Sequence, residues 1–591
     1  MSPRPLIVLK FGSSILKDET SIPDAIHEIY RWHRVGYRVV AVVSALHGTT
    51  DRLLAQGRAY HADPDGSALA ALAATGEATA AALVGLALDR AGLCAHVLDP
   101  AQIDLRTRGT PLDSEAISVN ARVIESALDE RPIAVIPGFV GRLDDGRQSL
   151  LGRGGSDLSA LFLARELQAE KCRLVKDVDG LYEFDPARPG PPPKRYRTIN
   201  FDDALAIDGR IVQHKSVKYA RQHGFGFEVG TLQNDRFTLV HAGPSRLEPL
   251  TLARPPLRVG VLGLGVVGRG VVAELLRQPD RFTVTGIAVR DIRRHAESGV
   301  PTELLTSDPW TVVHGPCEVV IEALSGGETA RVLIEAALKA GKKVVTANKA
   351  AVAQLSAACI DLVGTSLWCS ASVGGAVPVV ETACRIAKDR GVKQVEGVLN
   401  GTCNFVLDAV ADGATFDEAV AAAQKAGFAE ADPSADLDGI DAANKLIVLA
   451  RLALGVHISP GDVLTTGIRG IDEAAIREAA DTNCTYRLVA RVRRAGSGVV
   501  ATVEPRLLPN DHPFAQVKQE RNAAIIFPFD GEQTIVTGRG AGRWPTTEAV
   551  LGDLFEAARL LSQPAKEPLR AISAASSTSI EPKPAVTGTK S

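Results

Sequence analysis

A stretch of acidic residues with one lysine could do acid–base chemistry in the second half of the chain. Residues 427–450, GFAEADPSADLDGIDAANKLIVLA, hold six ionisable side chains: Glu430, Asp432, Asp436, Asp438, Asp441 and Lys445. From residue 439 onward the pattern predicts a helix, which places Asp441 and Lys445 one turn apart on one face. A surface ion pair is the alternative, but it does not explain five carboxylates crowded beside an apolar helix. The segment is therefore a candidate active site.

A second lysine precedes this segment. In TANKAAVA, residues 346–353, Asn348 and Lys349 follow directly after a predicted strand. Open α/β sheets present their ligands at the carboxyl ends of their strands. We therefore expect Lys349 to face a ligand.

A glycine-rich turn supplies the third chemical feature. Residues 258–276, RVGVLGLGVVGRGVVAELL, read as a strand, a turn and a helix, with Gly263, Gly265 and Gly268 in the G-x-G-x-x-G spacing. The first glycine permits the tight turn, the second lets a pyrophosphate approach, and the third lets helix and strand pack closely. The helix start at Val266 and Val267 would hold the phosphates. A turn without a ligand is the alternative.

The end of the next strand bears on the type of dinucleotide. FTVTGIAV, residues 282–289, is followed by Arg290, with Arg293 and Arg294 close behind. An acidic residue here would hold the ribose hydroxyl of NAD, whereas a guanidinium suits the 2′-phosphate of NADP. The pattern favours NADP, Asp291 keeps NAD open, and a merely solvated turn remains an alternative.

The first half carries a different chemistry, suited to phosphate. Lys10 ends the strand LIVLKF and precedes a Gly/Ser turn, and LLGRGGSD provides a second glycine-rich turn, residues 152–156, that enters a helix. Backbone amides at such a helix start can hold phosphate, and Arg153 can hold a carboxylate with two hydrogen bonds. KDVDGLYEFDPARPG then places Asp177, Asp179 and Tyr182 in a turn.

Composition limits the class of protein. The chain has 591 residues, 45% of them apolar and 23% charged, with a formal net charge of −3. This balance gives no electrostatic case for nucleic acid or an anionic membrane as a partner. The apolar run at residues 7–9 is too short for a signal peptide, and we see no uninterrupted run of membrane-spanning length. Eight cysteines without a C-x-x-C pair predict reduced thiols. We expect a cytoplasmic enzyme acting on small molecules.

Strands alternate with helices through both halves, which predicts α/β domains with parallel sheets. At this point a resemblance becomes specific. The chain from about residue 257 to 562 resembles homoserine dehydrogenase in VLGLGVVGRGVV, GIAVRD, VVIEALSG, KKVVTANKAAVA, ASVGGAVPVVE, VEGVLNGTCNFVL, the acidic stretch and GRGAGRWPTTEAVLGDL. The order and spacing of these motifs span the whole unit. The resemblance implies reversible reduction of aspartate-4-semialdehyde to homoserine by NAD(P)H.

The resemblance also implies roles for individual residues. Lys445 and Lys349 match the two active-site lysines, with Lys445 the expected proton donor and Asp441 orienting it. The implied substrate-binding residues are Glu430, Asp436, Asn400, Gly401 and Thr402, and Ser325 matches a nicotinamide-side loop. A Na⁺ or K⁺ ion held by the backbone carbonyls of Val373, Gly375 and Val377 is also implied. Ser370 stands where that loop usually begins with Glu, which weakens the ion assignment.

The first half resembles aspartate kinase, of the amino-acid kinase fold, which makes 4-phospho-aspartate from aspartate and MgATP. KFGSS, VVSA, TGE, GRGGSD and KDVDGLY carry the likeness. The matched positions are Lys10, Gly12, Ser13, Ser44, Glu77, Arg153, Gly155, Ser156, Asp157, Asp177 and Tyr182. Catalysis there would rest on positioning and on neutralising charge.

Four departures touch the ATP side of this resemblance. Ser13 replaces a glycine, Lys176 a threonine, Ala187 an arginine and Arg210 a lysine. Kinase activity is therefore one hypothesis. An inactive binding or oligomerisation module and a kinase of a different acid are the others.

These likenesses predict the organisation of the chain. We expect an aspartate kinase-like domain (1–242), a linker (243–256), a Rossmann domain (257–385), an α+β catalytic and dimerisation domain (386–540), a helix returning to the Rossmann domain (541–562) and a disordered tail (563–591). Fusions of these two enzymes usually carry regulatory ACT domains between them, and the predicted linker is too short for one. We expect a homodimer or homotetramer with weak or no inhibition by threonine.

Overall fold

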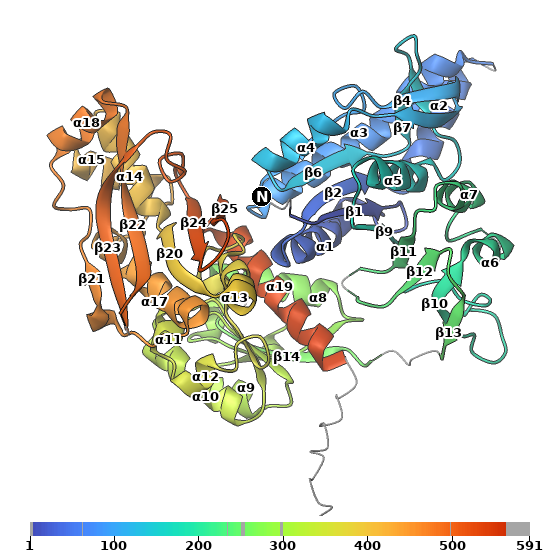
Figure 1. Cartoon of the computed structure of the whole chain (residues 1–591). Coiled ribbons are helices and arrows are strands. Elements are labelled where there is room, and N and C mark those ends of the chain that lie inside the picture. Colours follow the sequence, from blue (N-terminus) through green and yellow to red (C-terminus); the bar gives the residue numbers. More distant parts are fainter. Residues whose placement is uncertain are drawn as a thin grey trace, which may run out of the picture.

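A computed structural model describes residues 4–562, apart from residues 62, 208, 233, 250–253, 296–298 and 497. The chain folds into two halves that lie side by side, one coloured blue to green and the other green to red in Figure 1. The predicted tail, residues 563–591, lies outside the described residues. The expected order, an amino-acid kinase-type domain followed by a Rossmann domain and an α+β domain, is confirmed.

The first half is built on a nine-stranded sheet in the order β13-β10-β12-β11-β9-β1-β2-β6-β3. All six residues of the central strand β1 (Leu6–Phe11) are buried, which suits a parallel strand covered on both faces. It pairs in parallel with its two neighbours. The other strands are β2 (Arg38–Val43), β3 (Ala95–Val97), β6 (Ile133–Pro137), β9 (Lys171–Val175), β10 (Arg195–Asn200), β11 (Phe227–Gly230), β12 (Phe237–His241) and β13 (Arg246–Glu248).

Helices and a small second sheet complete this half. The helices are α1 (Ile22–Arg34), α2 (Thr49–Tyr60), α3 (Gly66–Arg90), α4 (Ala121–Glu130), α5 (Gly155–Glu166), α6 (Phe201–Ala206) and α7 (His214–Gln222). The four-stranded sheet consists of β4 (Arg106–Thr110), β5 (Asp113–Ser118), β7 (Val140–Arg142) and β8 (Gln148–Leu150). Buried residues Ile22, Ala25, Ile26 and Ile29 recur with helical spacing on α1, so one face of this helix enters the core.

Part of the predicted linker is a strand. Residues 246–248 form β13, which pairs antiparallel with β10 at the edge of the large sheet. Arg195 on β10 donates from Nε to Glu248 at 3.0 Å, which ties the added strand to its neighbour. The proline and basic residues around this segment are typical of a linker, and three paired residues are too few to give a strand pattern. The linker prediction is therefore wrong for residues 246–248.

Among the described residues, one helix has the length and composition to cross a membrane, although Glu77 interrupts its apolar sequence. It is α3, and half of its most apolar window is buried. The helix packs against α1, α2 and β6, and buried Ala73, Ala80 and Val84 lie on its inner face. These contacts identify α3 as a core helix of the first half.

The second half begins with a parallel six-stranded sheet in the order β16-β15-β14-β17-β18-β19. With β14 (Leu257–Leu262) as its first strand, this is the doubly wound order, and the order reverses between β14 and β17. Its other strands are β15 (Phe282–Ala288), β16 (Leu305–Thr306), β17 (Val319–Glu322), β18 (Lys343–Thr346) and β19 (Leu367–Trp368). The helices are α8 (Val266–Arg277), α9 (Pro309–His314), α10 (Glu328–Lys339), α11 (Lys349–Gln354) and α12 (Ala357–Ile360).

A mostly antiparallel sheet follows, in the order β21-β23-β22-β20-β24-β25. Its strands are β20 (Val392–Val398), β21 (Val463–Thr465), β22 (Cys484–Ala495), β23 (Gly498–Pro509), β24 (Arg521–Pro528) and β25 (Thr534–Arg539). The helices are α13 (Val379–Arg390), α14 (Gly401–Ala411), α15 (Phe416–Lys425), α16 (Ser434–Leu437), α17 (Ile440–Leu454) and α18 (Glu473–Asp481). The last helix, α19 (Arg543–Ser562), packs against α8 of the Rossmann sheet.

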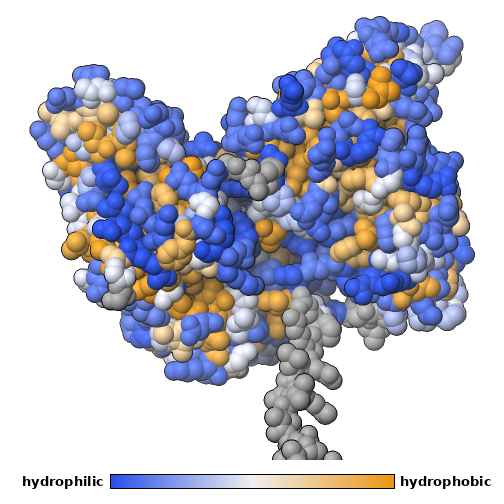
Figure 2. All heavy atoms as spheres, viewed as in Figure 1, coloured by the Kyte–Doolittle hydropathy of each residue, from blue (hydrophilic) through white to orange (hydrophobic). Residues whose placement is uncertain are grey.

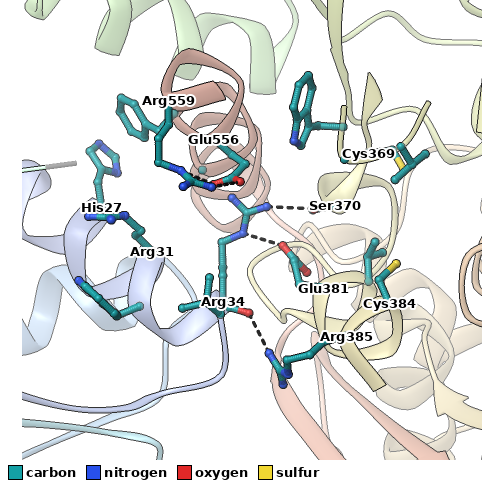
Figure 3. Close-up of a pocket in the computed structure, with 18 of the residues that line it drawn as sticks. His27, Arg31, Arg34, Cys369, Ser370, Glu381, Cys384, Arg385, Glu556 and Arg559 are labelled. Atoms are coloured by element: carbon teal, nitrogen blue, oxygen red, sulfur yellow. Dashed lines mark hydrogen bonds and ion pairs between the residues drawn. The ribbon is translucent and has the colours of Figure 1, made fainter. Parts of the chain in front are cut away.

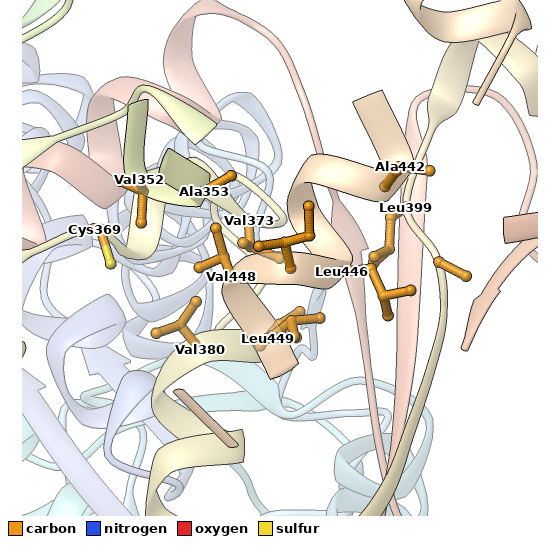
Figure 4. Packing of buried hydrophobic residues seen from close by; sticks show 14 of the residues in the cluster. Val352, Ala353, Cys369, Val373, Val380, Leu399, Ala442, Leu446, Val448 and Leu449 are labelled. Carbon is orange, nitrogen blue, oxygen red and sulfur yellow. The ribbon is translucent and has the colours of Figure 1, made fainter. Parts of the chain in front are cut away.

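Helix α17 forms the centre of the largest core. Leu446, Val448 and Leu449 are fully buried, and Figure 4 shows them among Val352, Val380 and further apolar side chains. Burial of each such side chain contributes roughly 1.5–3 kcal/mol. This packing fixes the helix that carries Asp441 and Lys445.

The two halves meet through buried charges. His27 on α1 contacts Glu548 on α19 at 2.6 Å and Glu274 on α8 at 3.4 Å. Burial alone would lower the pKa of His27, but the two carboxylates raise it to about 10. Buried polar contacts therefore join the two halves.

Polar side chains predominate on the outer face shown in Figure 2, where apolar residues are scattered.

Candidate active sites

In the second half, one carboxylate is held between two lysines. Asp441 lies on α17 and Lys349 opens α11, and Lys349 Nζ is 2.8 Å from Asp441 Oδ1. Lys445 Nζ is 2.8 Å from the other oxygen, Oδ2, one helical turn away. The helix predicted from residue 439 onward is present and begins at Ile440, with Gly439 as its N-cap. Two segments that are distant in the sequence thus converge on Asp441.

Charge fixes the ionisation of this cluster. Burial would raise the pKa of Asp441, but Lys445 and Lys349 hold it well below its usual range. Asp441 in turn raises the pKa of Lys349. The Lys349 side chain is 41% exposed and that of Lys445 is 9% exposed. One lysine is therefore open to a ligand and the other is enclosed.

The LNGTCN segment, residues 399–404, lies against the Lys–Asp–Lys cluster. Asn400 caps α14 by accepting from the Cys403 amide, and its Nδ2 donates to Asp436 at 2.6 Å and to Asp441 at 2.9 Å. Thr402 donates from Oγ1 to the Phe428 carbonyl at 2.7 Å. A Cβ at Gly401 would lie 2.8 Å from the Glu520 Cα, so only glycine allows this approach of two backbones.

The acidic stretch divides into two groups. Asp436 joins the site, and burial together with the charge of Asp441 raises its pKa. Asp432 instead accepts from the Ser434 amide, and Asp438 pairs with Arg469 at 2.7 Å. Glu430 is exposed, and its charge helps to raise the pKa of Lys349. Two of the five carboxylates therefore serve local structure.

Two further groups at the site were missed by sequence reasoning. Lys445 donates to the Leu399 carbonyl at 2.6 Å, and Asn522 donates to the same oxygen at 3.2 Å. Asn522 is buried on β24. No local motif marks either position, because a backbone carbonyl has no sequence signature and β24 reaches the site only through the fold.

The glycine-rich turn has the geometry that a dinucleotide needs. Gly263 has φ +99°, and a Cβ there would lie 2.6 Å from the Ala323 carbonyl oxygen. A Cβ at Gly268 would lie 2.1 Å from the Gly263 oxygen, whereas one at Gly265 would meet no described atom within 4 Å. Open space therefore lies just before the start of α8 at Val266 and Val267, where helix amides attract phosphate.

The remaining predicted cofactor residues lie at the same edge of the sheet. Arg290 follows β15, Ser325 follows β17, and Arg290 Nη2 donates to Ser325 Oγ at 2.6 Å. Asn348, after β18, caps α11 and donates to the Gly326 carbonyl at 2.7 Å. The carboxyl ends of these strands thus bring the turn, Arg290, Ser325 and Lys349 to one edge.

The predicted cation loop is buried. Val373, Gly375 and Val377 all belong to it, and Gly375 has φ +56°. The Val377 carbonyl already accepts from the Val379 amide at 2.7 Å. No cluster of His, Cys, Asp or Glu suited to a metal occurs among the described residues. The monovalent-cation site stays a prediction.

In the first half, a cavity of about 650 Å³ gathers most of the predicted kinase residues. Those that line it are Lys10, Ser13, Ser44, Glu77, Arg153, Gly155, Ser156 and Asp157. Arg210 and Lys176, two of the departures from the family pattern, line it as well. The cavity lies over the carboxyl end of β1 and the start of α5.

Asp157 repeats the arrangement of the other half. Its Oδ1 is 2.7 Å from Lys10 Nζ, and its Oδ2 is 2.8 Å from Lys176 Nζ. Burial would raise the pKa of Asp157, but the two lysines lower it to about 2. A Cβ at Gly12 would lie 2.6 Å from Lys10 Nζ, so the glycine leaves room for this ammonium. Lys176 thus completes a second Lys–Asp–Lys cluster.

The other predicted kinase residues differ in their surroundings. Glu77 is buried on α3, and burial raises its pKa to about 8. Asp177 is exposed, and Tyr182 donates to Asp179 at 2.5 Å. Asp177, Tyr182 and Gly12 do not line the cavity. Of the nucleotide-side turn, Lys176 therefore lines the cavity, whereas Asp177 and Tyr182 do not.

Comparison with known proteins agrees with both halves. Residues 378–555 match the family model for homoserine dehydrogenase, residues 263–366 the model for the homoserine dehydrogenase NAD-binding domain, and residues 5–223 the amino acid kinase family. The chain is 39% identical over 319 residues to homoserine dehydrogenase of Corynebacterium glutamicum, covering 51% of this chain and 72% of that protein. It is 34% identical over 311 residues to the Bacillus subtilis enzyme, covering 50% and 72%.

Solved structures are similar over the same unit. A homoserine dehydrogenase from Thiobacillus denitrificans matches with 33% identity and a TM-score of 0.49, covering 52% of this chain and 74% of that one. The two matched dehydrogenase models follow one another in the chain, behind the kinase-family match. The chain therefore belongs to the homoserine dehydrogenase family, with a domain of the amino acid kinase family preceding the dehydrogenase unit.

Proposed function

We propose that this chain is a bifunctional enzyme of aspartate-derived amino-acid synthesis. Residues 257–562 reduce aspartate-4-semialdehyde to homoserine with NAD(P)H, reversibly, and residues 4–242 phosphorylate aspartate with MgATP. The observation that carries the first activity is Asp441 held between Lys349 and Lys445 at the carboxyl edge of a dinucleotide-type sheet. The second rests on the Lys10–Asp157–Lys176 cluster in a cavity at a helix start.

In the reduction, the nicotinamide supplies the hydride to the carbonyl carbon. Lys445 Nζ gives a proton to the carbonyl oxygen, and Asp441 with the Leu399 carbonyl orients that ammonium. Lys349, which is partly exposed and follows strand β18 of the Rossmann sheet, binds the substrate. Glu430 and Asp436 hold the substrate's amino group, since a nearby ammonium favours their ionised forms.

The cofactor residues divide between phosphate and ribose. Gly263, Gly265 and Gly268 shape the turn, and the amides of Val266 and Val267 hold the pyrophosphate. Arg290 selects NADP through the 2′-phosphate, and Ser325 positions Arg290 and the nicotinamide side of the site. We expect Arg290→Ala to raise KM for NADPH about tenfold with KM for NADH unchanged. Equal changes in KM for NADPH and for NADH would show that Arg290 does not bind the 2′-phosphate.

In the phosphoryl transfer, positioned charge does most of the work. Lys10 and Lys176 neutralise the transferring phosphoryl group, and Gly155 with Ser156 offers amides from the start of α5. Arg153 holds the aspartate carboxylate, and Ser44 and Glu77 lie on the substrate side. Mg²⁺ enters with ATP.

One assay on the full chain tests both activities. Hydroxylamine traps acyl phosphate formed from ATP and aspartate, while NADP reduction with homoserine reports the dehydrogenase in the same sample. Lys10→Ala should abolish the hydroxamate and leave NADP reduction intact. If wild type forms no hydroxamate while ATP still raises its melting temperature, the first half is an inactive binding module. Replacing aspartate by other acids in this assay covers a different substrate.

Three further proposals follow from the family. We infer that Na⁺ or K⁺ at the carbonyls of Val373, Gly375 and Val377 supports the dehydrogenase site, that the chain works as a homodimer or homotetramer, and that it is cytoplasmic. Homoserine oxidation in Tris buffer with and without KCl or NaCl tests the first. Light scattering of the purified chain tests the second.

A further inference from the structure

A second cavity lies between the two halves. It has a volume of about 520 Å³ and is enclosed by α1 of the first half and by α13 and α19 of the second (Figure 3). It shares no lining residue with the kinase cavity, and the Lys–Asp–Lys cluster of the dehydrogenase is not part of it. Neither proposed reaction uses this cavity.

Most charges in its lining are already paired. Arg34 donates from Nε to Glu381 at 2.6 Å and also pairs with Asp553. Arg559 pairs with Asp235 at 2.6 Å and with Glu556, and Arg31 pairs with Asp235. The pairs of Arg34 with Glu381 and Asp553, and of Arg559 with Asp235, join the two halves.

Arg385 is the exception. No carboxylate of the described residues lies within 4.0 Å of its guanidinium, and its hydrogen bond to the Arg34 carbonyl is 3.5 Å long, at the outer limit for such a bond. Burial lowers the pKa of Arg385. Burial and the like charge of Arg385 also lower the pKa of Arg4. An anion beside Arg385 would relieve both effects.

Glu381, one turn before Arg385 on α13, has unused capacity of the opposite sign. Its Oε1 accepts from Arg34, but its buried Oε2 accepts no hydrogen bond from the described residues. Glutamate and arginine with this i,i+4 spacing commonly pair with each other on a helix. Here no ion pair joins them, although the charges of Glu381 and Asp389 partly offset the effect of burial on the pKa of Arg385. Among the described residues, a cation without an ion pair and a carboxylate oxygen without a hydrogen bond thus flank one cavity. A ligand ammonium at this carboxylate would share it with Arg34.

The rest of the wall is apolar. Trp368 and Val380 are 5% and 4% exposed, and Cys384 and Phe555 also line the cavity. An apolar group placed against them would be removed from water, at about 25 cal/mol per Å² of surface buried. The volume is within the range of small-molecule sites.

We propose that this cavity binds an α-amino acid with an apolar side chain, its carboxylate at Arg385, its ammonium at Glu381 and its side chain against Trp368 and Val380. This goes beyond the proposed function, because no bond is made or broken there. These four residues all belong to the second half, and α1 of the first half lines the same cavity.

Calorimetric titration of the full chain tests the ligand class. The probes are L-leucine, 4-methylpentanoate, which lacks only its amino group, and 3-methylbutylamine, which lacks only its carboxylate. We expect L-leucine to bind with a Kd at least tenfold lower than either analogue, and glycine to bind at least tenfold more weakly than leucine. Comparable affinity of leucine and its two analogues, or no binding of L-leucine, L-methionine or L-phenylalanine at 10 mM, overturns the proposal.

Two variants of α13 locate the site. Arg385→Gln and Lys388→Gln each remove one cation from the same helix, but Lys388 is exposed and does not line the cavity. We expect Arg385→Gln to weaken leucine binding at least tenfold and Lys388→Gln to leave it unchanged, with both enzyme activities retained. If Arg385→Gln does not fold, Val35→Phe narrows the cavity from a position that is 53% exposed. Leucine binding unchanged in the folded cavity variant places the ligand elsewhere and refutes the proposal.

Discussion

Each half of this chain holds one buried aspartate between two lysines, yet the two clusters are built differently. Asp441 lies between Lys445, one turn along the same helix, and Lys349 from the Rossmann unit. Asp157 lies in the first turn of α5, and its partners Lys10 and Lys176 come from the ends of the neighbouring strands β1 and β9. The first cluster bridges two structural units, whereas the second lies within one sheet and its covering helix.

The difference extends to exposure and charge. Lys349 is 41% exposed and Asp441 raises its pKa. Lys10 is 5% exposed, and burial lowers its pKa despite Asp157. Lys445, enclosed and oriented by Asp441, suits proton transfer to a carbonyl. Two buried lysines on one aspartate at a helix start instead form a positive site that suits phosphate. The same three residues thus support different chemistry in different settings.

The largest expected effect is on the dehydrogenase. Lys445→Ala removes the proposed proton donor and should lower kcat for NADPH-dependent reduction by about 10²–10⁴-fold. Lys349→Ala should act more on KM for the semialdehyde, because that lysine is the exposed member. Near-normal kcat in Lys445→Ala would show that another group supplies the proton. Absorbance at 340 nm gives both constants.

A slightly smaller effect is expected at the other cluster. Asp157→Asn leaves Lys10 and Lys176 without their shared counter-charge and should lower hydroxamate formation by about 10²–10³-fold, since mispositioned charge no longer stabilises the transferring group. Asp177→Asn is the matched control, because Asp177 is exposed and outside the cavity. Dehydrogenase activity should be unchanged in both variants. A loss of both activities in Asp157→Asn would point to unfolding instead.

The comparison also isolates Lys176. Lys176→Thr restores the residue type that the aspartate kinase pattern has, and it leaves Asp157 with one lysine. We expect KM for ATP to rise about tenfold with a smaller change in KM for aspartate, because Lys176 acts on phosphate. Lys171→Thr, on the same strand and outside the cavity, should change neither constant. Improved kinase activity in Lys176→Thr would show that Lys176 inhibits phosphoryl transfer.

Much of the dehydrogenase site could be predicted, because its chemistry is written in local patterns. The helix spacing of Asp441 and Lys445 and the glycine turn both specify their own geometry. The role of Leu399 could not be predicted, since its carbonyl becomes important only where α14, α17 and β24 meet. Asp432 and Asp438 looked equivalent to Asp436, and only their partners in the fold separate them.

The kinase-like half was harder to predict, for a physical reason. Lys176 was recognised as a departure, but its contact with Asp157 depends on the pairing of β1 with β9, which no local pattern specifies. Strand β13 was assigned to a linker because a three-residue edge strand has too little periodicity to detect. The polar contact between the halves, with His27 against Glu274 and Glu548, joins positions hundreds of residues apart.

The smallest expected effect separates the two sites by their pH dependence. Burial raises the pKa of Glu77 to about 8, whereas Asp441 stays ionised. The folded state therefore keeps a proton on Glu77 that the unfolded chain loses near pH 4.5, so this group makes stability fall as pH rises from about 4.5 to 8. The ammonium of bound aspartate favours ionised Glu77, so KM for aspartate should fall as pH rises from 7 to 8.5, by no more than about tenfold in total. Glu77→Gln should remove this slope and leave the pH profile of homoserine oxidation unchanged. A slope that persists in Glu77→Gln would assign the titration to another group of the kinase cavity.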